Sequence, residues 1–152
     1  SMLGYAAANV GEREVRTGYD NFMERTDGAD FPFISANIVR SDTKQPVFRP
    51  SIVIEVPGSE GAAGAKLGVV GVARFNPIFR KPGPDGTQLE IIHPVEAVRK
   101  EVASLRKQGV DLVILLAALD AAVGLPLALP VVLLASFCLR RRSALFMAQY
   151  FP

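Results

Sequence analysis

Residues 93–118 decide the fold of this chain, and they read HPVEAVRKEVASLRKQGVDLVILLAA. Within them, apolar side chains recur at helical spacing between charged ones: Val95, Val98, Val102 and Leu105. Pro94 suits the first turn of a helix, where its missing N–H costs nothing, and Gly109 suits the end. The apolar run DLVILLAA at 111–118 has the length and composition of a central parallel strand. Helix, short turn and buried strand together predict an α/β fold.

Upstream of this unit the sequence alternates between strand patterns and turn signals. Four further runs are rich in β-branched or small apolar residues, and they predict strands near Ala6–Val10, Phe33–Ile38, Ser51–Val56 and Lys66–Val72. The last two form an antiparallel hairpin in this interpretation. With Pro94–Gln108 as one helix and Asp111–Leu116 as the last strand, the result is a mixed sheet with flanking helices.

The connections are less regular. Gly18–Thr26 predicts a second helix, with Thr17 as its cap and Asp20 in a capping-box position. Ala73–Thr87 contains several prolines and turn residues and predicts a surface loop, whereas Leu89–Ile92 predicts a short strand.

Composition narrows the function classes. The chain has 152 residues, is 49% hydrophobic and carries a formal net charge of +2, which indicates a globular protein. No basic stripe interleaved with aromatic residues is present, so nucleic acid is not expected as a partner. Cys138 is the one cysteine and His93 the one histidine, so no cysteine–histidine set has zinc spacing. The first residues have no basic start with an apolar run, so no signal peptide is predicted.

Five pieces in order carry a family resemblance. They are a Gly-x-x-Glu turn at 11–14, FPFISANI at 31–38, IEV at 54–56 with KLGVVGV at 66–72, and the unit that starts at His93. In this order they resemble the middle of the catalytic domain of 5′-nucleotidases and related calcineurin-like metallophosphatases. The resemblance covers residues 5 to about 119 and implies an internal fragment of a partial metallophosphatase-type sandwich.

The resemblance implies a two-metal phosphoester hydrolase. Such a site activates water and clamps the phosphoryl oxygens with divalent metals of the Mn, Zn, Co or Mg type. The family's ligands come from an early Asp-x-His, a Gly-Asp motif, a Gly-Asn-His-Glu turn and later histidines. Phosphate esters or nucleotides are the implied substrates, and an extracytoplasmic or periplasmic location is the family's usual one.

The turn departs from that pattern, because it reads Gly11-Glu12-Arg13-Glu14. Glu12 stands at the position of the metal-binding Asn and could still ligate a metal, since carboxylates are good ligands for hard cations. Arg13 stands at the position of the catalytic His; it could bind phosphate in bidentate fashion but cannot shuttle a proton. The alternative for both residues is a solvated, charged turn.

Four other polar residues receive structural interpretations. Glu14 is expected to bond loop amides, and His93 to cap a helix or lie on the surface. Ser35 and Asn37 are expected to form hydrogen bonds near the floor of the site, with no direct chemistry.

Most implied ligands are missing from this chain. The early Asp-x-His segment would lie before Ser1, and the later histidine would fall near Ala117 and Ala118. At most one ligand survives, so no metal is expected to bind this chain alone.

The resemblance stops at Asp120, which divides the chain into residues 1–119 and an apolar tail, 120–152. Ala121–Leu139 is uncharged and is followed by Arg140–Arg142, a length and basic flank that satisfy a membrane span. A non-homologous end and a buried core helix remain as alternatives. The tail is expected to form a separate, largely helical or irregular segment.

Three functions compete. The first is a fragment of a metal-dependent phosphoester hydrolase, inactive as the isolated chain. The second is a non-catalytic module that binds an anion or a protein partner on the same fold. The third is a membrane-attached scaffold, which rests on the tail alone.

Overall fold

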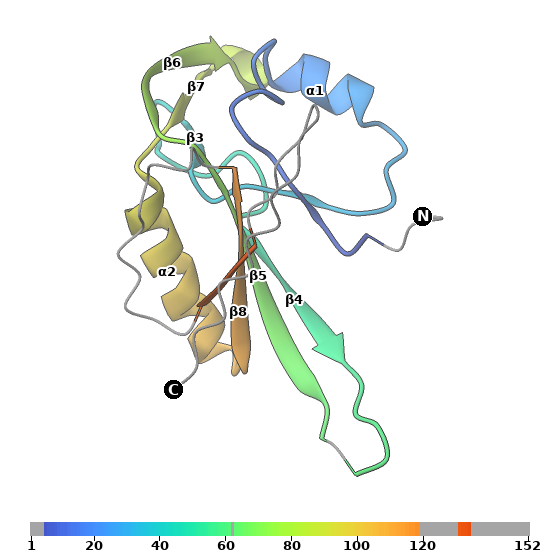
Figure 1. The fold of residues 1–152 in the computed structure, drawn as a ribbon. Coiled ribbons are helices and arrows are strands. Elements are labelled where there is room, and N and C mark those ends of the chain that lie inside the picture. Colours follow the sequence, from blue (N-terminus) through green and yellow to red (C-terminus); the bar gives the residue numbers. More distant parts are fainter. Residues whose placement is uncertain (1–4, 62, 119–130, 135–152) are drawn as a thin grey trace, which may run out of the picture.

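The main sheet has four strands in a computed structural model that describes residues 5–61, 63–118 and 131–134. Their order is β4-β5-β8-β9, with bounds β4 Ser51–Val56, β5 Ala65–Ala73, β8 Leu112–Ala118 and β9 Val131–Leu134. β4 and β5 form the predicted antiparallel hairpin, and β8 runs parallel to β5 and β9. The α/β fold class with a mixed sheet is therefore confirmed, and β8 is a central strand as its apolar run predicted (Figure 1).

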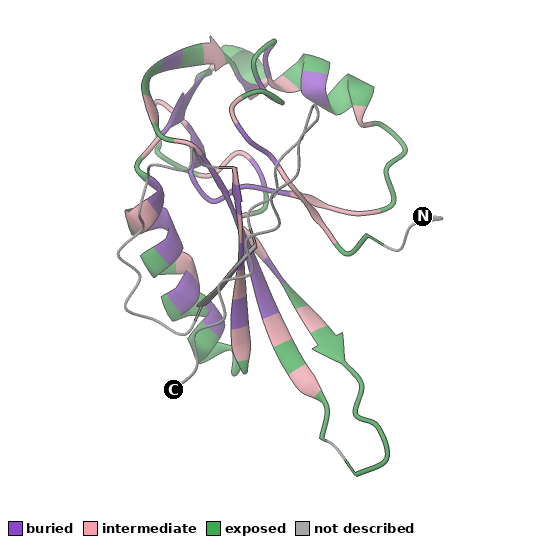
Figure 2. Cartoon of the chain, viewed as in Figure 1, coloured by how far each residue is buried: buried purple, intermediate pink, exposed green. Residues whose placement is uncertain are grey.

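Helix α2 (Pro94–Lys107) covers one face of this sheet. Its apolar stripe packs on β5 and β8 in a cluster of buried side chains that includes Val70, Val98, Val102, Leu105, Val113 and Leu115. Gly68 of β5 allows the close approach, because a Cβ there would lie 2.8 Å from Leu105 Cδ1. Figure 2 shows the buried residues gathered where the helix meets the sheet, and the tip of the β4–β5 hairpin exposed.

The predicted strand Phe33–Ile38 is divided between two small sheets. β2 (Phe33–Ile34) pairs in parallel with β1 (Ala8–Asn9), whereas β3 (Ile38–Arg40) pairs with β7 (Gln88–Ile91) in the order β3-β7-β6. Between them the backbone turns to other partners, since Ser35 N donates to Arg49 O at 3.0 Å and Ala36 N to Gly71 O at 2.7 Å. One continuous strand-like stretch of sequence, residues 33–40, therefore contributes strands to two different sheets.

The prediction of a surface loop over Ala73–Thr87 is wrong for half of that range. β6 (Asn76–Pro82) pairs with β7 across a register irregularity, and a 3₁₀ turn, η1 (Pro84–Gly86), follows. Prolines mislead here because β6 is an edge strand, where a missing N–H breaks no ladder bond. Phe79 is buried and anchors the strand in the core.

Helix α1 (Tyr19–Arg25) lies close to its predicted position but lacks the predicted cap. Gly18 is the N-cap residue with φ 104, and no side chain caps the helix. Thr17 Oγ1 instead donates to Asn21 Oδ1 at 2.8 Å. Glycine is favoured at Gly18 because a positive φ strains other residues, so backbone geometry starts this helix where a capping box was expected.

The tail expectation differs from the structure at one place. Val131–Leu134 forms β9 on the outer edge of β8, so these residues belong to the sheet and not to a separate helix or a helical membrane span. A β-branched apolar run suits a parallel strand. The rest of the tail lies outside the described residues. Within the described part of the chain, none of the helices combines the length and apolar character required to cross a membrane.

Two glycines of β5 give a matched test of packing. A Cβ on Gly71 would lie 2.5 Å from Ile34 O and 2.6 Å from Asn9 Oδ1, whereas a Cβ on Gly68 would meet the end of the Leu105 side chain. A leucine end can rotate and a backbone carbonyl cannot. We expect Gly71→Ala to lower the free energy of unfolding by about 3 kcal/mol and Gly68→Ala by about 1 kcal/mol, measured by urea denaturation. Equal losses would contradict this packing.

Candidate functional site

The turn after β1 meets the end of β8. Gly11 is buried, and a Cβ on it would lie 3.0 Å from Ala118 Cβ. Its N–H donates to Glu14 Oε2 at 3.0 Å, so Glu14 bonds a loop amide as the sequence indicated. The β5–β8 register places Ala73 opposite Ala118. The carboxyl ends of β1, β5 and β8 therefore converge at one edge of the fold, which we call the converging edge.

Glu12 points to the β5–β6 connection at this edge. Its Oε2 accepts from Arg74 Nη2 at 2.8 Å, and its Oε1 accepts from Asn76 Nδ2 at 3.1 Å. The Glu12 side chain is 22% exposed and that of Arg74 is 44% exposed. Both carboxylate oxygens thus have protein partners in this structure, and one partner is a cation.

Arg13 lies beside Glu12 in the turn but is exposed. Its carbonyl accepts from Arg16 N at 3.4 Å, and no side-chain contact of its guanidinium is found among the described residues. The structure therefore separates the two candidate residues: Glu12 is held by neighbours, whereas Arg13 faces solvent.

Asn37 and Ser35 are both fully buried, at 0% exposure, beneath this edge. Asn37 Nδ2 donates to Ala73 O at 2.8 Å and to Ile92 O at 2.9 Å, and its Oδ1 accepts from Ala73 N at 2.7 Å. Asn37 thus joins the end of β5 to the residue after β7, a structural role like the one the sequence suggested. Ser35 Oγ has no hydrogen-bond partner among the described residues.

His93 is the N-cap residue of α2, where its Nδ1 accepts from Val95 N at 3.4 Å. Its ring also lies 5.4 Å, centroid to centroid, from that of Phe75. Capping and exposure agree with the structural interpretation of this histidine, and within the described part of the chain it belongs to no group that could hold a metal.

The side chains at the converging edge do not fit a divalent metal. Ala117 and Ala118 stand where the later histidine was expected, and alanine offers no ligand atom. Glu12 is engaged by Arg74 and Asn76. Across residues 5–61, 63–118 and 131–134, no three His, Cys, Asp or Glu side chains gather as a metal would need.

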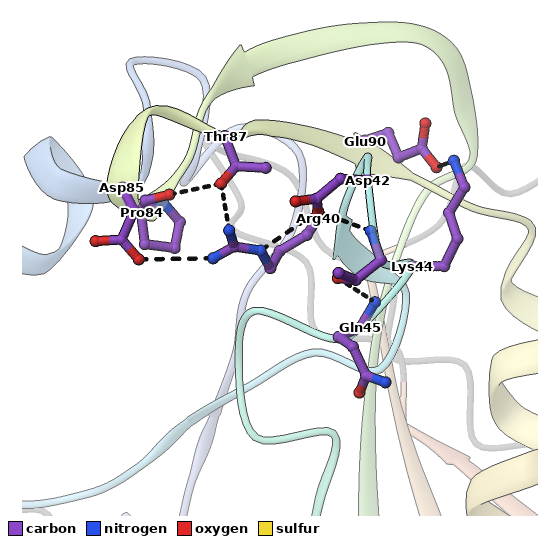
Figure 3. A network of polar contacts seen from close by, with 9 residues as sticks. Arg40, Asp42, Lys44, Gln45, Pro84, Asp85, Thr87 and Glu90 are labelled. Atoms are coloured by element: carbon purple, nitrogen blue, oxygen red, sulfur yellow. Dashed lines mark hydrogen bonds and ion pairs between the residues drawn. The ribbon is translucent and has the colours of Figure 1, made fainter.

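A second charged cluster, at β3, β7 and η1, is a set of paired charges (Figure 3). Arg40 contacts Asp42, Asp85 and Thr87. The buried Glu90 pairs with both Lys44 and Arg80. The Thr43 backbone N–H, together with Arg40, lowers the pKa of Asp42 below its usual value. Because each carboxylate here has a basic partner, the cluster closes a turn between strands and offers no site.

The chain is similar in sequence to known nucleotidases. A 2′,3′-cyclic-nucleotide 2′-phosphodiesterase/3′-nucleotidase of Yersinia enterocolitica is 29% identical over 118 residues, which cover 75% of this chain and 18% of that protein. A 5′-nucleotidase of Diplobatis ommata is 31% identical over 120 residues, covering 75% of this chain and 19% of the relative. The chain therefore spans about a fifth of the length of these relatives.

This chain is similar in sequence to 5′-nucleotidases and cyclic-nucleotide phosphodiesterase/3′-nucleotidases, and its fold is similar to that of calcineurin-like phosphoesterases. The calcineurin-like phosphoesterase YfkN of Bacillus subtilis superposes with a TM-score of 0.61 at 22% identity, over 80% of this chain and 36% of that one. A 5′-nucleotidase precursor of Thermus thermophilus gives 0.58 at 24% identity, over 76% and 22%. No protein-family model matches the sequence.

The metallophosphatase-type resemblance and fold are thus confirmed, whereas Glu12 and Arg13 as site residues stay predictions. Sequence reasoning missed Arg74 and Asn76, the partners of Glu12. A signal for them exists: polar residues follow a buried parallel strand directly, at the sheet edge where functional side chains gather. The surrounding prolines, which indicate a loop, obscure this signal.

The two buried polar residues beneath the edge provide a matched prediction. Asn37→Ala strips partners from the N–H and C=O of Ala73 and from Ile92 O, and each unpaired buried group costs about 1–3 kcal/mol. We expect a loss of about 4 kcal/mol in the free energy of unfolding. Ser35→Ala removes a hydroxyl without a partner and should change stability by less than about 0.5 kcal/mol. Urea unfolding followed by circular dichroism measures both, and a large loss from Ser35→Ala would contradict the hydrogen-bond assignment.

Proposed function

We propose that this chain is part of the catalytic domain of a metal-dependent phosphoester hydrolase. The observation that carries the proposal is the converging edge, where the turn after β1 touches the end of β8 at Ala118. Strand ends that meet in this way are where α/β folds place their chemistry. The related phosphodiesterase/nucleotidases and 5′-nucleotidases support the same reaction class.

Phosphate esters or nucleotides are the proposed substrates of the whole protein, since the relatives are named for such activities. The proposed location, by the same resemblance, is extracytoplasmic or periplasmic. Substrate choice is assigned to parts of the protein other than this chain, which matches about a fifth of the relatives' length.

The isolated chain is proposed to be inactive. Two-metal hydrolysis needs both metal positions filled, because one ion activates water while the pair clamps attacking and leaving oxygens. The described residues supply Glu12 at most, and its oxygens are already bonded to Arg74 and Asn76. What this chain supplies is the floor: the central strands, α2 and the buried Asn37 that fixes the end of β5.

A non-catalytic anion-binding module is the second candidate, and one observation favours it. Arg13 is an exposed guanidinium at the converging edge, and no side-chain partner is found for it in the described part of the chain. A guanidinium can hold a phosphate through paired N–H donors without any metal. Arg13 is accordingly the residue on which this alternative rests.

The two candidates make different predictions for phosphate binding. If the module binds anions through Arg13, inorganic phosphate titrated into the metal-free chain should give saturable shifts in amide NMR signals of residues 11–14, and Arg13→Met should abolish them. The hydrolase-segment proposal predicts no such saturation at millimolar phosphate. Arg25→Met, at an exposed arginine in the last turn of α1, is the matched control.

The hydrolase-segment proposal also predicts no turnover by the isolated chain. We expect the hydrolysis of bis(p-nitrophenyl) phosphate and of adenosine monophosphate, with added manganese, zinc or cobalt, to equal the protein-free rate. The double variant Glu12→Asn with Arg13→His restores the family's residues and should still not rescue activity, because other ligands remain absent. Turnover above a metal-free control that Glu12→Ala abolishes would overturn the proposal of an inactive segment.

A further inference from the structure

Glu12 forms a hydrogen-bonded cluster with Arg74 and Asn76. Its carboxylate is mostly shielded, with 22% of the side chain exposed, and it faces Arg74 from β5's end and Asn76 from the start of β6. Arg74 and Asn76 lie 62 and 64 positions after Glu12 in the sequence. They join the turn after β1 to the connection between two other strands.

A metal at this position would compete with these partners. An ion bound to Glu12 would have to share the carboxylate with the Asn76 amide at 3.1 Å and with the Arg74 guanidinium at 2.8 Å, whose positive charge opposes it. Ala118 at the neighbouring strand end offers no ligand in return. A carboxylate paired with a guanidinium attracts a further cation less strongly, because the positive charge of the guanidinium offsets the negative charge of the carboxylate.

We infer that Arg74 takes the place of a metal cation in this chain, holding the Glu12 carboxylate and thereby fastening the β5–β6 connection to the turn after β1. The location of this edge as a former metal position rests on the proposed function, whereas the fastening rests on the contacts alone.

A double-mutant cycle tests the fastening. Glu12→Gln, Arg74→Met and the double variant of the full chain are compared by urea unfolding. We expect a coupling of about threefold in the folding equilibrium constant, the size typical of a partly exposed ion pair. The cycle is needed because Arg74 has further interactions, so its single substitution alone would overstate the pair.

Arg13→Met is the matched control, since it makes the same change on an exposed arginine adjacent to Glu12. Combined with Glu12→Gln it should give no coupling. If the Arg74→Met variant fails to fold, Arg74→Lys keeps the charge and should retain part of the coupling. Additive effects of Glu12 and Arg74 substitutions would overturn the inference.

Manganese titration tests the exclusion of metal. Free Mn²⁺, followed by its electron paramagnetic resonance signal, should show no saturable binding to the full chain at micromolar concentrations, whereas Arg74→Met should show saturable binding in the same range. Saturable binding by the unaltered chain that Glu12→Gln abolishes would overturn the inference.

The two proposals can fail separately. Isolated-chain turnover abolished by Glu12→Ala would refute the inactive hydrolase segment. Absence of coupling between Glu12 and Arg74, with no turnover, would refute only the Glu12–Arg74 link.

Discussion

The burial of the β5–β8 pair under α2 is the constraint on which the remaining structure depends. Two apolar parallel strands must be covered on the face where Gly68 lets Leu105 approach. Once they pair in the observed register, Ala73 and Ala118 come to the same edge. The turn after β1 then reaches that edge through its contact with Ala118. The geometry of the converging edge therefore follows from core packing.

Local patterns predicted the elements whose partners follow directly from periodicity. A short stretch of sequence is enough to predict α2, the β4–β5 hairpin and the central strand β8. Their predicted bounds agree with the structure to within a few residues. The divided strand at 33–40 and the edge strand β6 escaped, because their definition depends on which sheet accepts each backbone group. Prolines in β6 carry the same local signal on a loop and on an edge strand.

At the converging edge, too, the contacts between residues close in sequence were predictable, whereas those between residues far apart in sequence were not. Glu14 and His93 form bonds with residues two or three positions away, and a sequence argument reached both roles. Arg74 and Asn76 approach Glu12 from more than sixty residues along the chain. No spacing rule connects such positions, so the partners of Glu12 emerged only from the three-dimensional arrangement. The family resemblance predicts that Glu12 lies at a functional edge, and the tertiary contacts show that Arg74 balances its charge.

The tip of the β4–β5 hairpin is expected to tolerate insertions and cleavage better than the strands behind it. Its tip, residues 57–61, is exposed, whereas the strands behind it are paired from Ser51↔Val70 to Val56↔Ala65. The tip lies at the end of the hairpin away from the converging edge, where Ala73 closes β5. Exposed loop tips are where insertions and backbone cleavage are best accepted. A peptide grafted into this tip, or a single cut there, would leave the two strands held by their ladder. The hairpin is thus a natural handle for labels and fusions.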